Sequence, residues 1–144
     1  MGEQGKVIIV GMDFSEPAIR ALELGIHYAQ KLEAPIHVVH AYDIPRLPTG
    51  NTAEVEKSFT TWLAKNSKEQ LDALLDKYKS NDVALFGDMV AGDPATKICE
   101  TARKYEAQLI IVGTKGHNVA YRALLGSVAD RVIRTSQRPV LMVH

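Results

Sequence analysis

The stretch GTKGHNVAYRALLGS, residues 113–127, lies between an apolar run and a helical pattern. The apolar run LIIV, residues 109–112, predicts a buried strand, and the spacing of apolar residues after Ser127 predicts a helix. Glycines let a backbone turn sharply and bring its N–H groups close to an anion. A helix that begins near Ser127 adds unpaired N–H donors and the positive end of its dipole. The stretch therefore predicts a place for a phosphate group.

Outward from this stretch, the chain alternates between strand and helix patterns. Apolar runs predict strands over residues 7–10, 36–42, 83–91, 108–112 and 138–143. Helical spacing covers residues 16–32, 52–79 and 94–105, and a last helix runs from about 124 or 127 to 135. The pair Asn66-Ser67 interrupts the second helical pattern and would allow a kink or a break there.

Helix starts carry recognisable capping residues. Ser15 and Asp93 each precede a proline by one or two positions and are predicted N-caps. Ser127, with Asp130 three residues later, resembles a capping box in which Asp replaces Glu. The resulting order, βαβαβαβαβ, predicts a three-layer α/β sandwich with a five-stranded, mostly parallel sheet. A length of 144 residues without an internal repeat fits a single domain over 1–144.

Composition excludes several classes of partner. The chain has 17 Lys and Arg against 17 Asp and Glu, so no net charge draws it to nucleic acid or to an anionic membrane. No run approaches the roughly 20 apolar residues of a membrane span, and the first residues lack the apolar segment of a signal peptide. The single cysteine, Cys99, reads as a small buried side chain and fits a reducing compartment. We therefore expect a cytoplasmic protein that binds neither nucleic acid nor membrane.

Two predicted strand ends carry candidate binding residues. Gly11, Met12, Asp13 and Ser15 follow the first strand, and the glycine stretch from Gly113 follows the fourth. In an open α/β sheet, ligands bind beyond the carboxyl ends of strands where the strand order reverses. If the first and fourth strands are neighbours, one loop could hold a base and the other phosphates. Spacing along the sequence does not settle that adjacency.

The pattern Gly113-x2-Gly116-x9-Gly126-Ser127 resembles the nucleotide-binding pattern of the universal stress protein family, in its ATP-binding branch. The segments VGMDFSEPA, VVHAY, AGDPA and LLGSVADRVIR resemble the same family, so the likeness spans the chain. The resemblance implies a Rossmann-like sheet of order 3-2-1-4-5, of the adenine nucleotide alpha hydrolase type. It also implies ATP in the crevice between the first and fourth strands, and a homodimer formed through the last strand, Val140–Val143.

The resemblance assigns two sets of binding positions. The set that follows the first two strands is Gly11, Met12, Asp13, Ser15 and Ala41. In that set Asp13 would contact the adenine, and Ala41 would offer backbone groups to the base. The set at the ribose and phosphates is Gly113, Thr114, Gly116, His117, Gly126, Ser127, Val128 and Ala129. Lys115 and residues 118–121 depart from the family pattern.

The residues leave several alternatives open. His40 reads as a hydrogen-bonded core histidine, whereas Lys115 and Arg122 could either neutralise phosphates or be solvated. No residues have metal-ligand spacing, although magnesium or manganese could accompany the phosphates, and no P-loop is present. No base for hydrolysis is evident, so we expect nucleotide binding without efficient turnover. A nucleotide-independent interaction module and a slow ATPase stay as alternatives, as do AMP and ADP as ligands.

Overall fold

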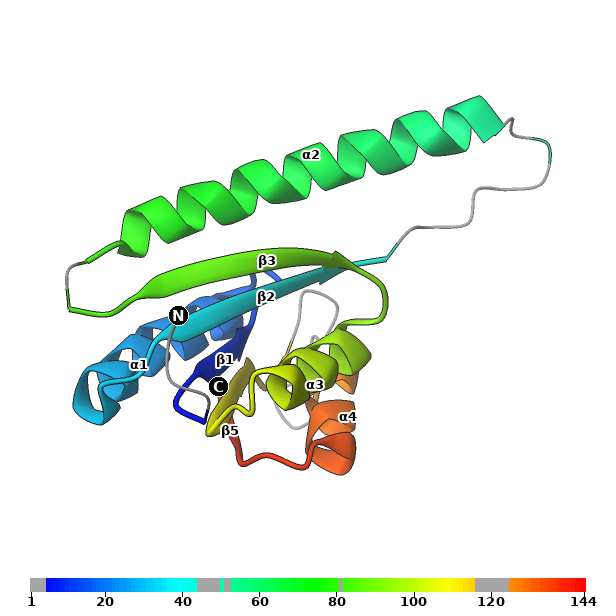
Figure 1. The fold of residues 1–144 in the computed structure, drawn as a ribbon. Helices are drawn as coiled ribbons and strands as arrows, with labels where there is room; N and C mark the ends of the chain where they lie inside the picture. The colour runs from blue at the N-terminus through cyan, green and yellow to red at the C-terminus, as the bar shows by residue number, and fades with distance from the viewer. Residues whose placement is uncertain (1–4, 44–49, 51–52, 81, 116–124) are drawn as a thin grey trace.

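The computed structural model describes residues 5–43, 50, 53–80, 82–115 and 125–144 (Figure 1). Nine elements follow one another along these residues in the predicted alternation. They are β1 (Ile8–Gly11), α1 (Glu16–Leu32), β2 (Ile36–Tyr42), α2 (Ala53–Tyr78), β3 (Leu85–Ala91), α3 (Pro94–Lys104), β4 (Leu109–Gly113), α4 (Ser127–Thr135) and β5 (Val140–Val143).

The strands form one parallel sheet of order β3-β2-β1-β4-β5, which confirms the predicted fold class and strand order. β1 lies at the centre, where Ile9 pairs with His37 of β2 on one side and Ile110 of β4 on the other. The chain extends the sheet from β1 first to one side and then to the other. β1 and β4 are therefore neighbours that end at the same edge of the sheet.

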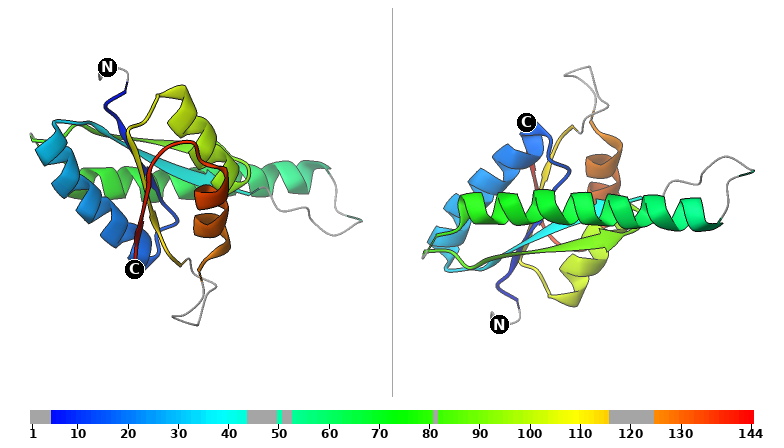
Figure 2. Two further views of the ribbon diagram at one scale, coloured as in Figure 1. Left: turned by 90° about the horizontal axis from the view of Figure 1, so that it is seen from below. Right: turned by 90° about the horizontal axis from the view of Figure 1, so that it is seen from above.

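Helices cover both faces of the sheet (Figures 1 and 2). On one face, α1 and α2 pack over Ile8, Val10 and Ile36, which are fully buried. On the other face, α3 and α4 pack over Ile9, Ile110 and neighbouring residues. Strands covered on both faces need apolar side chains in both directions, which explains why the runs of β1 and β4 do not alternate with polar residues.

Some predicted features of the helices and strands differ from the structure. α2 runs without a break through Asn66 and Ser67, because Ser67 is buried among the residues that α2 packs onto the sheet. Burial of one helix face outweighs the weak helix propensity of two polar residues. β3 begins at Leu85 rather than Val83, and β5 begins at Val140, after Pro139. Within the described residues, no helix combines the length and the apolar character needed to cross a bilayer.

Candidate functional site

A cavity of about 280 Å³ lies beyond the carboxyl ends of β1 and β4. It is lined by Gly11, Met12, Asp13, Ser15, Ala18, Val39, Ala41, Pro94, Ile98, Val112, Gly113, Lys115, Gly126, Ser127, Val128 and Ala129. Both predicted loops therefore meet in one place. The predicted Gly116 and His117 lie outside the described residues. The predicted Thr114 is not among the lining residues.

The loop after β1 is fixed by short-range hydrogen bonds. Ser15 is the N-cap of α1, as predicted, and its Oγ accepts from the N–H of Ala18 at 3.4 Å. The Asp13 carboxylate accepts from the N–H of Ser15 at 2.9 Å and also from the Ser15 hydroxyl. The Ser15 Oγ lies 3.5 Å from the carbonyl oxygen of Lys115, so the loop after β1 contacts the loop after β4. The Asp13 side chain is thereby held at the exposed mouth of the cavity.

His40 supports the same loop from β2. Its Nδ1 lies 2.8 Å from the carbonyl oxygen of Met12, and its ring lies 4.8 Å from that of Phe14. The N–H of Met12 donates to the carbonyl of Val39 at 2.9 Å. The predicted hydrogen bond of His40 is confirmed, and its partner is the backbone of a lining residue, but the side chain is half-buried and not part of the core.

Gly113 is required by close packing. A Cβ placed on Gly113 would lie 2.8 Å from the Cβ of Pro17 and 2.9 Å from the backbone nitrogen of Ala18. A side chain there would push the start of α1 away from β4. A Cβ on Gly11 would lie 2.7 Å from the Cδ1 of Ile98, which crosses above the sheet from α3. The two glycines therefore let α1 and α3 approach the strand ends closely enough to wall the cavity.

The predicted capping box at the start of α4, with Ser127 as the N-cap, is wrong. Gly126 is the N-cap, with φ −63° and ψ 150°, and no side chain caps the helix. Ser127 is instead the first helical residue. The first intrahelical bond at this end runs from the N–H of Asp130 to the carbonyl of Gly126 at 3.0 Å. Among the described residues, the N–H groups of residues 127–129 have no hydrogen-bond partner, and all three residues line the cavity.

Thr114, the residue after β4, contacts β5 and is not among the residues that line the cavity. Its N–H donates to the carbonyl of Val143 at 2.8 Å, and its Oγ1 lies 3.3 Å from the Nδ1 of His144. Its carbonyl accepts from the N–H of Gly126 at 2.6 Å. Thr114 thus joins β4 to β5 and brings the start of α4 back to the end of β4.

Residues 5–144 match the sequence profile described as "Universal stress protein family". The chain belongs to the universal stress protein family. A universal stress protein of Methanocaldococcus jannaschii is 31% identical over 141 residues, which cover 96% of this chain and 81% of that protein. The family resemblance of the sequence is therefore confirmed.

Solved universal stress proteins share the fold. The protein UspA from Lactobacillus plantarum superposes with a TM-score of 0.85 at 21% identity, over 99% of this chain and 100% of that one. A universal stress protein from Archaeoglobus fulgidus, in complex with dAMP, superposes with a TM-score of 0.67 at 23% identity, over 99% of this chain and 100% of that one.

Sequence reasoning missed part of the wall of this universal stress protein's cavity. Pro94 and Ile98 come from the first turns of α3, and Val39 comes from β2. In the sequence, these residues appear as a proline at a helix start and as members of apolar stripes. Such patterns also occur in helices and strands that pack in a core and border no cavity. Only the position of α3 over the strand ends shows that these side chains also face a cavity.

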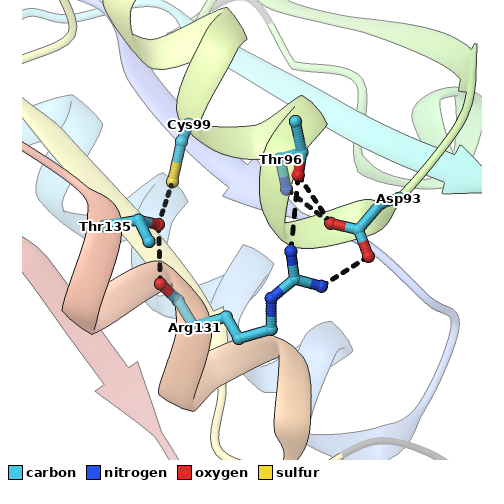
Figure 3. Close-up of polar contacts among 5 residues, drawn as sticks. All are labelled: Asp93, Thr96, Cys99, Arg131 and Thr135. Carbon is cyan, nitrogen blue, oxygen red and sulfur yellow. Dashed lines mark hydrogen bonds and ion pairs between the residues drawn. The ribbon is translucent and has the colours of Figure 1, made fainter.

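Asp93 fixes the start of α3 and joins it to α4 (Figure 3). Its carboxylate accepts from Nη1 of Arg131 at 2.6 Å and from the N–H and the hydroxyl of Thr96 at 2.9 and 2.7 Å. The hydrogen bond from Arg131, followed by the two from Thr96, lowers the pKa of Asp93 to about 2. The same pairing raises the pKa of Arg131. The ion pair holds α3 and α4 in their positions around the cavity.

Few charged side chains line the cavity. Asp13 at the end of β1 and Lys115 at the end of β4 are the ionisable side chains in its described lining. In the described parts of the chain, no three His, Cys, Asp or Glu side chains gather in a way that could hold a metal ion. The described site therefore offers backbone donors, one carboxylate, one lysine and largely apolar walls.

Proposed function

We propose that this universal stress protein binds an adenine nucleotide, ATP in the first place, in the cavity between β1 and β4. The observation that carries the proposal is the start of α4. Its uncapped N–H groups face a cavity whose other walls are largely apolar. Unpaired donors at a helix N-terminus favour an anion, and apolar walls favour a planar base, so the two ends match the two halves of a nucleotide.

The base belongs at the apolar end. Val39, Ala41 and Ile98 supply aliphatic walls, and backbone groups near Met12 and Ala41 can satisfy the edge of the ring. The Asp13 carboxylate is held at the mouth, where it can accept a hydrogen bond from the ligand. A volume of about 280 Å³ is close to the lower end of the roughly 300–1,000 Å³ usual for small-molecule sites, which suits a mononucleotide.

The phosphates belong at the start of α4. Ser127, Val128 and Ala129 present first-turn N–H groups, and Ser127 adds a hydroxyl. Gly126 has no side chain that could block the approach, and Lys115 brings a positive charge. Thr114 offers no atom to the described cavity. The roles of Gly116 and His117 toward the phosphates stay predictions.

Comparison with a solved relative supports an adenine nucleotide as the ligand. The Archaeoglobus fulgidus universal stress protein in complex with dAMP covers this chain almost completely. The two proteins share the fold, so the same edge of the sheet is available to a ligand in both.

The proposed role is regulation by occupancy, without efficient turnover. Hydrolysis requires a positioned water and charge neutralisation at the γ-phosphate, and the described lining offers one lysine and no base at that end. Magnesium or manganese would travel with the phosphates, held mainly by phosphate oxygens and water. The nucleotide changes the surface shown to partners only if it binds one conformation better than another.

A homodimer completes the proposal. β5 is an edge strand, and its four residues are apolar. An apolar edge favours pairing with another strand, and pairing with its own copy gives a two-fold symmetric dimer.

The test is the ligand released when the purified protein is denatured. We expect an adenine nucleotide by mass spectrometry, and we expect added ATP to be recovered intact after many residence times. Absence of released nucleotide, together with no calorimetric heat on addition of ATP and magnesium, would contradict binding and favour the nucleotide-independent module. Steady magnesium-dependent release of phosphate would favour the slow ATPase.

A further inference from the structure

A second hollow, of about 300 Å³, lies between α3, α4 and the segment that leads into β5. It is lined by Thr96, Cys99, Glu100, Arg103, Arg131, Thr135, Ser136, Gln137 and Arg138. None of these residues lines the cavity at the strand ends. The two hollows are separated by the start of α3, where Pro94 faces one and Thr96 faces the other.

Basic residues outnumber acidic ones around the second hollow. Arg103, Arg131 and Arg138 line it, against one acidic residue, Glu100. Glu100 is paired with Lys97 at 3.0 Å, so its charge is partly compensated outside the hollow. Asp93 compensates the charge of Arg131, so Arg103 and Arg138 are the cations at the hollow that an anion between them would stabilise.

Hydrogen bonds hold the side chain of Arg131 in one orientation beside the hollow (Figure 3). Its Nη1 donates to Asp93 at 2.6 Å, and its Nη2 lies 3.5 Å from the Oγ1 of Thr96. A guanidinium carries five N–H donors, so these contacts leave others for a ligand. The planar group is thus oriented before any ligand arrives, which reduces the entropy lost on binding.

Arg103 and Arg138 are the other two basic residues that line the hollow. In the part of the chain that the structure describes, neither side chain forms an ion pair. The backbone of Arg138 is fixed by Ser136, whose Oγ accepts from the N–H of Arg138 at 2.9 Å and donates to its carbonyl at 3.1 Å. The negative end of a helix dipole stabilises cations near the helix C-terminus. That effect alone does not explain why the basic residues gather around one hollow.

We propose that this hollow is a second binding site, and that its ligand is a phosphate dianion, either free or as the phosphate of a small phosphomonoester. Guanidinium groups match phosphate oxygens in charge and in bidentate geometry. The hydroxyls of Thr96, Thr135 and Ser136 already donate within the protein, so the guanidiniums and the amide of Gln137 supply the donors. This site does not depend on nucleotide binding at the strand ends.

The test is a titration of the ¹⁵N-labelled full chain with inorganic phosphate, and in parallel with glycerol 3-phosphate, at constant ionic strength kept with sodium chloride. We expect saturable shifts of the amides of Gln137 and Arg138. The double variant Arg103→Gln/Arg138→Gln should weaken binding by about tenfold or more, because it removes two charged donors. The control Arg134→Gln, which makes the same kind of charge change outside the hollow, should alter the affinity by less than about twofold.

The arms of the titration also identify the source of the phosphate. Tighter binding of glycerol 3-phosphate than of inorganic phosphate assigns the site to a phosphomonoester, and the reverse order assigns it to the free ion. Shifts confined to the amides of residues 127–129 would overturn the proposal. So would equal affinity in the double variant, or the same shifts produced by sodium chloride alone.

Discussion

At the scale of single residues, Ser127 carries much of the proposed function. It is the first residue of α4, and neither its N–H nor its hydroxyl has a hydrogen-bond partner among the described residues, so both can meet a phosphate. The expectation that it caps the helix was wrong by one position, since Gly126 takes the N-cap. A glycine cap supplies no side-chain acceptor, and the donors stay available to a ligand.

Two substitutions of Ser127 separate its two donors. Ser127→Ala removes the hydroxyl and should weaken ATP binding by about tenfold, because a hydrogen bond to a charged group is lost. Ser127→Pro removes the N–H as well, and α4 should tolerate it, since proline is favoured at the first helical position and Gly126 is already extended. It should weaken binding by about tenfold more. Calorimetry measures both, with thermal unfolding as the check on folding, and equal affinities in the three proteins would place the phosphates elsewhere.

Asp93 gives a prediction about pH. Its pKa is about 2 in the folded protein, below the ordinary value of 3.8, so its ion pair stabilises the fold above pH 3.8 and is lost as pH falls through about 2. Asp93→Asn keeps a good N-cap but removes the charge. The wild type should therefore be more stable than the variant at neutral pH, and the difference should vanish toward pH 2. Urea unfolding across this range measures it, and a difference independent of pH would show that Arg131 does not act through the charge.

Residues differ in how far the sequence predicts them. The loop from Gly11 to Ser15, together with Gly113 and Gly126, could be predicted because turns and helix starts have local signals. Ile98 could not be, because an apolar side chain on a helix stripe reads the same whether it faces a core or a cavity. Thr114 was assigned by resemblance, but its hydrogen bonds direct it toward β5.

At the scale of elements, the close approach of α1 to β4 depends on Gly113. Gly113→Ala would bring a Cβ to within 2.9 Å of backbone atoms at the start of α1, which cannot move alone. We expect it to lower the free energy of unfolding by about 1–3 kcal/mol, as overpacking does. Gly25→Ala is the matched control, because its nearest neighbours are side-chain atoms at 3.2 and 3.4 Å.

Gly25→Ala should lower the free energy of unfolding less than Gly113→Ala does. Alanine favours a helix by about 1 kcal/mol relative to glycine, which offsets the tighter packing that the new Cβ causes at position 25. Urea unfolding of both variants checks the expectation. A Gly113→Ala protein as stable as wild type would mean that α1 can shift freely and does not fix the wall of the cavity.

Element boundaries show where local signals fail. The pair Asn66-Ser67 would allow a kink or a break in α2, but burial of Ser67 against the sheet keeps the helix continuous. The start of α4 was uncertain by several residues, because residues 124–127 contain both apolar and capping signals. Tertiary contacts decide these cases, and a single sequence does not display them.

At the scale of the whole molecule, the order of the strands came from resemblance. Alternating patterns predicted a parallel sheet, but they left the adjacency of β1 and β4 open. The structure supplies it, since Ile9 pairs with Ile110 and the loops after both strands touch through Ser15 and Lys115. A site that depends on two segments about 100 residues apart in the chain needs the fold before it can be seen.

The proposed homodimer is tested at the edge strand. Met142 is 39% exposed on β5, whereas Leu141 packs against the core, so Met142→Lys is the less disruptive probe. A lysine on the exposed side of β5 would place a charge at the proposed interface in each copy, and we expect the variant to sediment as a monomer. An unchanged dimer would show that β5 is not the interface, and a monomeric wild type at micromolar concentration would remove the dimer altogether.

The most direct measurement is a crystal structure of the protein grown with ATP and magnesium. We predict density for adenine beside Ala41 and Ile98, and for phosphates within hydrogen-bond distance of the N–H groups of residues 127–129. An empty cavity, or a nucleotide bound with its phosphates away from the start of α4, would contradict the proposed binding mode.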